Sequence, residues 1–295
     1  MPELPEVETI ATDLNKRIKN LKVIDFKITN ERTQRLRPLI NFSEKVFKQR
    51  VVLNKIISVD RRAKHLVIDF GNYVILIHLK MTGQLVYKGC KKNKCEVVAG
   101  GHPIIGGGEN LPNKFTRAIF ELNDGSTLYF NDVRRFGWLK LLNKNEYIEF
   151  EKSLGLEPLS REFTLEKFKE ILERKRNVKI KQALLEQKYL VGIGNIYADE
   201  SLFLAKIKPM RQVKTLTVNE IKKLWQVIPK VLKLAIKHRG TSFNDYRDAQ
   251  GEKGNFINYL NVYGRAGQKC KNCNGFVLKI KIAGRGTHWC DRCQK

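Results

Sequence analysis

The chain opens with MPELPEVETI, residues 1–10, which places three glutamates and two prolines at the start of a basic protein. Apolar residues recur at helical spacing through this stretch and beyond it, at Val7, Ile10, Leu14, Ile18 and Leu21. Pro5 suits the first position of the helix that this pattern predicts, and the helix dipole favours acids in the first turn. This interpretation accounts for Glu8 but leaves Pro2 and Glu3 unexplained.

The composition indicates a soluble protein with a polyanionic partner. The 295 residues carry 56 Lys and Arg against 30 Asp and Glu, a formal charge of +26. Such an excess points to nucleic acid or to an anionic membrane surface. The longest apolar run, YVILI at 73–77, is too short to span a membrane, and no signal peptide is recognisable. We therefore expect a cytoplasmic protein that binds nucleic acid, whose six cysteines are reduced thiols or metal ligands.

Residues 21–142 have the pattern of β-structure. Two hairpins are predicted at 64–80 and 115–130, each with a short polar turn between apolar strands. The stretch 88–113 is rich in Gly and Lys, so it is predicted to be a long loop.

After about residue 150 the pattern becomes helical. Helical segments are predicted at 164–175, 179–187 and 192–205. The clearest helix follows a capping box of Thr217 and Glu220, should kink at Pro229 and stops at Gly240. Residues 241–262 read as a polar loop. The domain boundary should therefore fall near 150–160.

Four cysteines near the C-terminus form the strongest local motif. Cys270, Cys273, Cys290 and Cys293 have the spacing C-x2-C-x16-C-x2-C, which is typical of tetrahedral thiolate zinc. Four protein ligands leave no open position on the metal, so we expect one structural Zn²⁺. The last 31 residues hold eight Lys or Arg and one acid, which suits contact with phosphate.

Three other motifs leave alternatives open. Cys90 and Cys95 offer only two ligands, and we interpret them as plain thiols. VGIGN at 191–195 could present backbone N–H groups to a phosphate as it opens a helix, although Gly-x-Gly turns are common. NDVRRFGW at 131–138 suits either an interstrand packing corner or a wedge for unstacked DNA.

Pro2 acquires a chemical role if Met1 is removed. Its ring nitrogen then becomes an α-amine with a pKa of about 8, so part of it is unprotonated near neutral pH. Attack on a sugar C1′ gives an iminium, which is an electron sink. Glu3 and Glu6 would supply carboxyl groups for proton transfer. Many chains begin with Met-Pro by accident, so this remains one interpretation among several.

Seven motifs together resemble the formamidopyrimidine-DNA glycosylase family of bifunctional glycosylases and abasic-site lyases. They are MPELPEVET at 1–9, RRAKHL at 61–66, HLKMTGQL at 78–85, RRFG at 134–137, GIGNIYADESLF at 192–203, NVYGRAGQKC at 261–270 and GRGTHWCDRCQ at 284–294. The resemblance implies an α+β architecture. A β-sandwich flanked by helices would occupy 1–152, a helix–two-turns–helix domain with a lesion loop 153–262, and a zinc finger 263–295.

The resemblance also implies roles for single residues. Pro2 would be the nucleophile, Glu3 the acid/base, Glu6 a supporting carboxylate and Lys64 a catalytic-site lysine that contacts phosphate. Residues that would fill the gap left by the flipped base are Met81, Arg134 and Phe136. Residues that would bind DNA phosphates are Lys114, Asn195 and Arg285.

The implied reaction is removal of oxidised purines from duplex DNA by a monomer, followed by β,δ-elimination. The opening favours the oxidised-purine branch, because endonuclease VIII-like relatives tend to begin Pro-Glu-Gly-Pro. The loop at 241–262, which in this branch covers the extruded 8-oxoguanine, agrees. The chain departs from the family at Lys80, where Gly is frequent, at Phe115, where His is usual, and at Val133, where Pro is common.

Three other functions stay open from sequence. One is an endonuclease VIII-like enzyme for oxidised pyrimidines, which a panel of lesion duplexes would distinguish. Another is a catalytically silent DNA-binding relative, although the intact Pro2, Glu3 and Lys64 argue against it. The third is a zinc-ribbon protein that binds structured RNA, which would leave the N-terminal motif unexplained.

Overall fold

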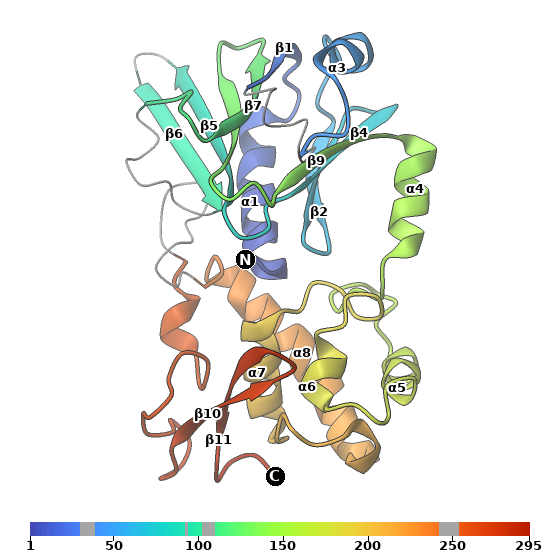
Figure 1. Ribbon diagram of the computed structural model, residues 1–295, viewed down its shortest axis with the longest axis vertical. Coiled ribbons are helices and arrows are strands. Elements are labelled where there is room, and N and C mark those ends of the chain that lie inside the picture. Colours follow the sequence, from blue (N-terminus) through green and yellow to red (C-terminus); the bar gives the residue numbers. More distant parts are fainter. Residues whose placement is uncertain (30–38, 92–93, 102–109, 242–253) are drawn as a thin grey trace. The chain divides into compact units, whose positions relative to one another are not determined.

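Figure 1 shows the computed structural model of the protein. It describes residues 1–29, 39–91, 94–101, 110–241 and 254–295. The chain divides into two compact units, one of residues 1–151 with 238–255 and the other of residues 152–237 with 256–295. Most of the predicted loop at 241–262, namely 242–253, lies outside the described residues.

The first unit contains two antiparallel sheets (Figure 1). The five-stranded sheet has the order β1 (Val23–Ile28), β7 (Thr116–Leu122), β8 (Thr127–Asp132), β5 (Gly83–Lys91), β6 (Lys94–Gly101). The four-stranded sheet has the order β2 (Ser58–Arg62), β3 (His65–Asp69), β4 (Tyr73–His78), β9 (Trp138–Asn143). The described helices of this part of the chain are α1 (Leu4–Ile18), α3 (Glu44–Arg50) and α4 (Lys144–Ser153), which begins directly after β9.

One hydrophobic core joins both sheets to two helices. Each element contributes fully buried side chains, for example Ile10 from α1, Phe47 from α3, Phe120 from β7 and Ile75 from β4. The helices therefore contribute to the same apolar cluster as the sheets. This confirms the predicted sandwich flanked by helices.

Helix α1 forms where its apolar periodicity predicts it. It begins at Leu4, so Pro5 occupies the second helical position and the prediction of the first position was wrong by one residue. The cause is Glu3, whose side chain and that of Glu6 form a capping box across the first turn.

The prediction of a long loop at 88–113 was wrong for its first half. Strands β5 and β6 pair antiparallel, from Gln84 opposite Gly101 to Lys91 opposite Lys94. Strand β6 lies at the edge of the sheet. Lysines commonly protect an edge strand from pairing with further strands. The lysines that suggested a loop are therefore equally typical of a hairpin at the edge of a sheet.

The two predicted hairpins are confirmed, and one helix was missed. Strand β3 pairs with β4 and β7 pairs with β8. Helix α3 interrupts the region that was predicted to be entirely β. Its signal was the cap residue Ser43, whose hydroxyl accepts a hydrogen bond from the N–H of Val46 at 3.3 Å.

The second unit is helical and ends in a β-hairpin. Its helices are α5 (Leu165–Glu173), α6 (Ile180–Leu184), α7 (Asn195–Ala205) and α8 (Val218–Lys237), with short 3₁₀ helices at Val213–Thr215 and Phe256–Tyr259. The hairpin consists of β10 (Val277–Ile282) and β11 (Arg285–Cys290). The predicted capping box is present, because the Thr217 N–H donates to Glu220 at 2.8 Å and the Glu220 N–H donates back at 3.2 Å.

Within the described residues, every helix is too short or too polar to cross a lipid bilayer.

Lys80, where the family often has glycine, adopts a left-handed backbone conformation with φ of +51°. This conformation brings the Lys80 N–H to Nδ1 of His78 at 3.0 Å. The left-handed conformation costs a side-chain-bearing residue about 1 kcal/mol. The departure from the family at this position is therefore tolerated at some cost in stability.

Replacing Lys80 with glycine should stabilise the protein, because glycine removes the left-handed strain. We expect a gain of up to about 0.5 kcal/mol in the free energy of unfolding, after the greater entropy of glycine in the unfolded chain is subtracted. Chemical denaturation would measure it. The control is Lys140→Gly in β9, which should destabilise the protein; a similar loss for Lys80→Gly would contradict the interpretation.

Candidate active site and DNA-binding groups

The N-terminal turn is held by the carboxylate of Glu6. One oxygen of Glu6 accepts a hydrogen bond from the backbone N–H of Glu3 at 2.9 Å. Pro2, Glu3 and Glu6 are all buried, with Glu3 only 4 % exposed. Met1 is 49 % exposed, so the Met1–Pro2 peptide bond, whose cleavage would free the Pro2 nitrogen, lies beside a solvent-exposed residue.

The second oxygen of Glu6 holds a distant part of the same unit. It accepts a hydrogen bond from the N–H of Thr241 at 2.8 Å. Gly240 makes this approach possible, because its φ is +77° and an added Cβ would lie 2.7 Å from the Glu6 carboxylate. The neighbouring Arg239 forms an ion pair with the fully buried Asp13 of α1. The chain entering 242–253 is thus fastened to the helix that carries the N-terminal turn.

Lys64 lies in the two-residue turn between β2 and β3. Arg61 fixes this turn to α1, because its guanidinium donates to Glu8 at 2.6 Å and to the carbonyl of Ala63 at 3.1 Å. Ala63 is left-handed, with φ of +56°. Lys64 is 6 % exposed, so the first unit buries the predicted lysine as it buries the predicted acids.

Two neutral imidazoles lie next to this turn. The rings of His65 and His78 meet edge to face, 4.8 Å apart. Burial lowers the pKa of His65 to about 4 and that of His78 to about 2, and nearby cations add to both shifts. Both rings are therefore uncharged at neutral pH, and Nδ1 of His78 accepts the N–H of Lys80.

Met81 and the RRFG motif are brought together by Asp132. Its carboxylate accepts hydrogen bonds from the hydroxyl of Thr82 at 2.5 Å and from the Gly137 N–H at 2.6 Å. The Arg134 N–H donates to the same Thr82 hydroxyl at 3.0 Å. Sequence reasoning missed Thr82 and Asp132, although both stand inside the motifs that it quoted.

The side chains of this group face outward. Met81 is 45 % exposed, and the guanidinium of Arg134 lies 4.7 Å from the ring centroid of Phe136. Phe136 is half-buried and does not belong to the cluster between the sheets. Lys114 is also exposed, with its ammonium 5.2 Å from the centroid of the Phe115 ring that stands where histidine is usual.

In the second unit, Gln187 shapes the turn that precedes α7. Its amide donates to the carbonyl of Ile193 at 2.8 Å and accepts from the N–H of Gly192 at 3.1 Å. The turn ends in Asn195, the first residue of α7. The start of a helix with its unpaired N–H groups is a suitable place for phosphate.

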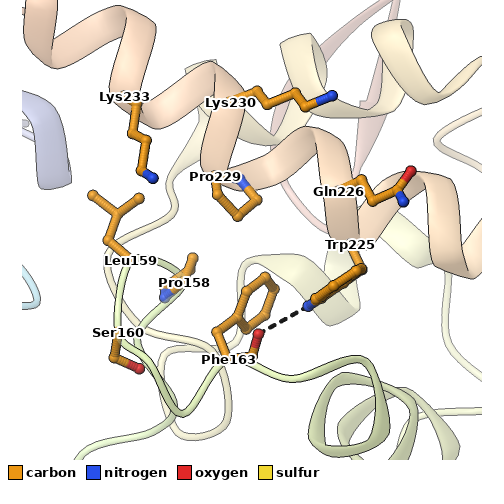
Figure 2. A pocket seen from close by; sticks show the side chains of 9 residues that line it. All are labelled: Pro158, Leu159, Ser160, Phe163, Trp225, Gln226, Pro229, Lys230 and Lys233. Atoms are coloured by element: carbon orange, nitrogen blue, oxygen red, sulfur yellow. Dashed lines mark hydrogen bonds between the residues drawn. The ribbon is translucent and has the colours of Figure 1, made fainter.

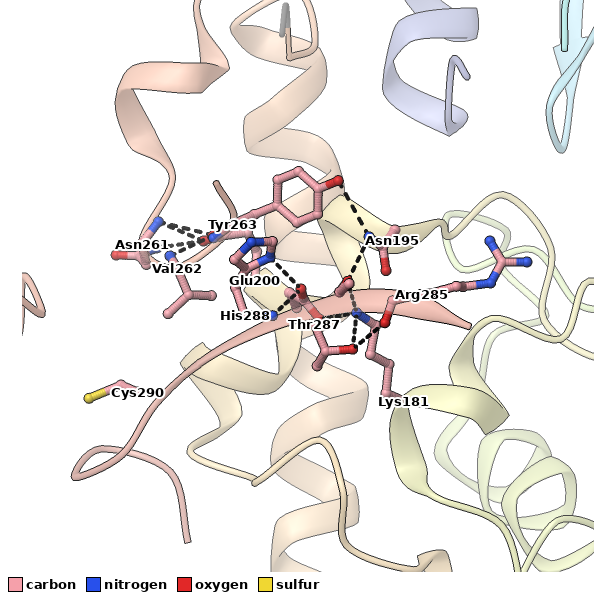
Figure 3. A network of polar contacts seen from close by, with 12 residues as sticks. Lys181, Asn195, Glu200, Asn261, Val262, Tyr263, Arg285, Thr287, His288 and Cys290 are labelled. Atoms are coloured by element: carbon pink, nitrogen blue, oxygen red, sulfur yellow. Dashed lines mark hydrogen bonds and ion pairs between the residues drawn. The ribbon is translucent and has the colours of Figure 1, made fainter. Parts of the chain in front are cut away.

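Asn195 and Arg285 are linked through the β10–β11 turn (Figure 3). The amide of Asn195 donates to the carbonyl of Gly286 at 2.9 Å and to the hydroxyl of Tyr263 at 3.3 Å. The ammonium of Lys181 donates to the same Gly286 carbonyl at 3.0 Å and to the Thr287 hydroxyl at 2.9 Å. Two of the three predicted phosphate-binding residues, Asn195 and Arg285, are therefore neighbours, and Arg285 is exposed.

Two adjacent acids on α7, Asp199 and Glu200, accept hydrogen bonds from residues of this network or next to it. Asp199 forms an ion pair with Lys181 at 2.6 Å, both side chains being fully buried, and accepts the N–H of His288 at 2.8 Å. Glu200 accepts the backbone N–H groups of Val262 and Tyr263, each at 2.9 Å. Burial raises the pKa of Glu200, while these hydrogen bonds oppose the shift. Sequence reasoning gave neither acid a role.

The four C-terminal cysteines have the geometry of a zinc site. Their sulfurs all lie within 4.8 Å of one another, with Cys270 and Cys293 at 3.7 Å and Cys273 and Cys290 at 3.6 Å. Tetrahedral zinc with Zn–S bonds of about 2.3 Å places sulfurs about 3.8 Å apart. Burial raises the pKa of Cys290, so a cluster of thiolates needs a cation. The cysteines fit one structural zinc, which supplies cross-linking and no open coordination position.

The site residues thus form three groups, each within one unit. The first contains the N-terminal turn and the second Met81 with the RRFG motif, both in the first unit. The third contains Asn195, Arg285 and the zinc cysteines in the second unit. A capped N-terminal turn, a helix N-terminus beside a basic hairpin and a thiolate metal site together indicate a zinc-finger enzyme that acts on nucleic acid.

Comparisons with known proteins agree with this class. Three family models match the chain in order: the Formamidopyrimidine-DNA glycosylase N-terminal domain at 1–139, the Formamidopyrimidine-DNA glycosylase H2TH domain at 154–246, and the zinc finger found in FPG and IleRS at 267–295. The Formamidopyrimidine-DNA glycosylases of Pelotomaculum thermopropionicum and Heliobacterium modesticaldum are 38 % and 39 % identical. The matches cover 100 % of this chain and 99 % and 100 % of those proteins.

Solved structures of Lactococcus lactis Fpg have the same fold. Its complex with DNA containing an abasic site matches with a TM-score of 0.83 and 33 % identity over 99 % of both chains. Its complex with DNA containing an oxidised pyrimidine matches with a TM-score of 0.82 and 34 % identity over 100 % of both chains.

The fold and site therefore define a zinc-finger DNA glycosylase. The chain belongs to the formamidopyrimidine-DNA glycosylase family, as its motifs predict. It is a base-excision repair enzyme for oxidised bases, with the abasic-site lyase activity characteristic of that family, and DNA is its partner.

Breaking the buried Lys181–Asp199 pair should be costly. Lys181→Met leaves a buried carboxylate without its cation, so we expect a loss of about 3–5 kcal/mol in the free energy of unfolding. Adding Asp199→Asn should recover part of this loss, because the remaining group is neutral and still accepts the N–H of His288. Denaturation of the full chain would measure both variants.

The matched control is Lys175, whose ion pair with Glu186 at 2.9 Å is partly exposed. Lys175→Met should cost less than about 1 kcal/mol. Equal losses for Lys175→Met and Lys181→Met would show that burial does not set the strength of the inner pair.

Proposed function

We propose that this enzyme removes oxidised purines, 8-oxoguanine and formamidopyrimidines, from duplex DNA, and that it works as a monomer with Pro2 as its nucleophile. The observation that carries the proposal is the N-terminal turn. Glu6 fixes the backbone of Glu3 at 2.9 Å, so the residue before it has a defined position at the end of α1. A free N-terminal amine held in this way is a preorganised nucleophile.

The chemistry follows from the groups at this turn. After loss of Met1, the Pro2 nitrogen attacks C1′ of the damaged nucleotide, a C1′–N bond forms and the glycosidic bond to the base breaks. A proton must reach the sugar ring oxygen or the departing base, and Glu3 is the acid placed next in sequence to the nucleophile. The resulting iminium makes the C2′ protons acidic, so removal of one of them by a base expels the 3′ phosphate. Removal of the C4′ proton from the conjugated iminium then expels the 5′ phosphate.

Lys64 and the exposed groups bind phosphates, assist proton transfer and fill the gap in the base stack. Lys64 contacts a phosphate of the damaged nucleotide and helps proton transfer. Phosphate contacts outside the reacting nucleotide fall to Lys114, Asn195 and Arg285. Met81, Arg134 and Phe136 occupy the space that the extruded base leaves, because an empty gap in the stack would favour its return.

Oxidised pyrimidines are a second class of substrate. The Lactococcus lactis relative has been solved with DNA that contains an oxidised pyrimidine. We propose that oxidised purines are preferred here, since the chain opens with Pro-Glu-Leu-Pro-Glu rather than Pro-Glu-Gly-Pro. Rates of excision on duplexes that carry either class of lesion would rank the two.

Borohydride trapping tests the nucleophile. Reduction should link the enzyme covalently to duplex DNA that contains 8-oxoguanine, because the iminium is reduced to a stable amine. Peptide mapping should place the link at residue 2, and an N-terminal tag that cannot be removed should abolish activity. Full activity with Met1 retained and blocked would refute the proposal.

Phe136→Ala tests the wedge. Because Phe136 is half-buried outside the core, stability should change little. Excision from duplex DNA should slow, while cleavage at a ready-made abasic site should be affected less. The control is Phe130→Ala, which removes a fully buried core ring and should cost about 3–5 kcal/mol. A similar loss of stability for Phe136→Ala in thermal melting would reject the wedge.

A further inference from the structure

A cavity in the second unit has no place in the reaction just described. It has a volume of about 490 Å³ and lies between α8 and the segment before α5 (Figure 2). Its walls are formed by Pro158, Leu159, Ser160, Phe163, Trp225, Gln226, Pro229, Lys230 and Lys233. None of the residues assigned above to catalysis, phosphate or zinc lines it.

The floor of this cavity is apolar, and two of the polar groups that line it are already paired. The indole N–H of Trp225 donates to the carbonyl of Phe163 at 2.9 Å (Figure 2). The hydroxyl of Ser160 donates to the carbonyl of Glu157 at 2.8 Å. Pro229 has no N–H to offer. A ligand would therefore meet mainly ring and aliphatic surfaces on the floor of this cavity.

The rim of the cavity carries positive charge. Lys230 and Lys233 are exposed, stand on the same helix three residues apart, and form no ion pair with any described residue. In Figure 2 the side chain of Lys233 extends toward Leu159 across the cavity. An occupant that complements this site needs an apolar group for the floor and carboxylates for the rim.

We propose that this cavity docks a short acidic segment of a partner protein through one aromatic or proline anchor. Grooves lined by aromatic residues commonly accept proline and extended peptides, and rim charges favour a partner of opposite sign. A peptide is favoured over DNA because the rings and aliphatic groups of the floor suit an apolar side chain better than a phosphate or a base edge. The groups of this unit that face DNA, Asn195 and Arg285, belong to a different set of residues.

The test is a binding measurement on the full-length enzyme with a defined probe. The probe is a fluorescent eight-residue peptide with six glutamates around a central Phe-Pro, and its companion has Ser-Ser in place of Phe-Pro. Fluorescence polarisation at physiological salt should show binding of the first peptide and at least tenfold weaker binding of the second. This difference separates docking from mere attraction to a basic protein.

Charge reversal on α8 locates the site. The double variant Lys230→Glu with Lys233→Glu should bind the peptide about tenfold more weakly, because two attractions become repulsions. The matched control is Lys222→Glu with Lys223→Glu, which changes the same charge at exposed positions of the same helix outside the cavity. Both variants should cleave lesion DNA as the unmodified enzyme does, which shows that they are folded.

Four results would overturn the proposal. One is equal weakening by the two double variants, and another is equal affinity for the two peptides. The third is displacement of the peptide by a short single-stranded oligonucleotide whose own binding is weakened only by the Lys230 and Lys233 reversals. That result would make the cavity a nucleic-acid site. Absence of any binding by the Phe-Pro peptide would also reject it.

Discussion

The N-terminal half of this enzyme depends on one carboxylate that accepts two backbone N–H groups. Glu6 is 2 % exposed and joins the first turn of α1 to Thr241, 235 residues later in the chain. Without it the residues that precede α1 would be an ordinary fraying terminus. With it, the nitrogen of Pro2 lies at the end of a rigid helix whose apolar face is part of the sandwich core. Catalysis by a chain terminus requires such a constraint, because a mobile amine would have to be ordered in every turnover.

Buried carboxylates also hold the backbone at other candidate groups. Asp132 accepts two backbone N–H groups of the RRFG turn, and Glu200 accepts those of three consecutive residues. Asp199 anchors the zinc-finger hairpin through Lys181 and His288. These carboxylates are all nearly or fully buried. A protein of charge +26 therefore uses some of its few acids inside, as acceptors that shape the backbone, and presents cations outside to the polyanion.

Local patterns predicted what depends on local spacing. The apolar stripe predicted α1, short polar turns between apolar strands predicted the two hairpins, and the cysteine spacing predicted the zinc site. The strands at 83–101 were missed because β5 is stabilised by pairing with β8, some 45 residues away in sequence, and not by its own composition. Asp132 and Asp199 were missed for the same reason. Asp132 and Asp199 have partners only because the fold brings Thr82 and Lys181 next to them. Sequence spacing and residue propensity do not predict such long-range contacts.

Backbone strain marks the same groups independently. Among the described residues, eight that are not glycine have positive φ. Five of these adjoin or closely precede candidate groups or, at Arg239, the glycine that approaches Glu6. Ala63 precedes Lys64, Lys80 precedes Met81, Arg135 separates Arg134 from Phe136, Arg239 precedes Gly240, and Ala283 lies two residues before Arg285. A left-handed residue turns the chain sharply, which lets the next side chain leave the sheet or helix that supports it. Such conformations cost about 1–3 kcal/mol each and persist only where surrounding contacts enforce them. Here the enforcing contacts include those of Arg61, Asp132 and Asp13. The buried polar groups and the strained turns are therefore two parts of one arrangement that fixes the candidate groups in place.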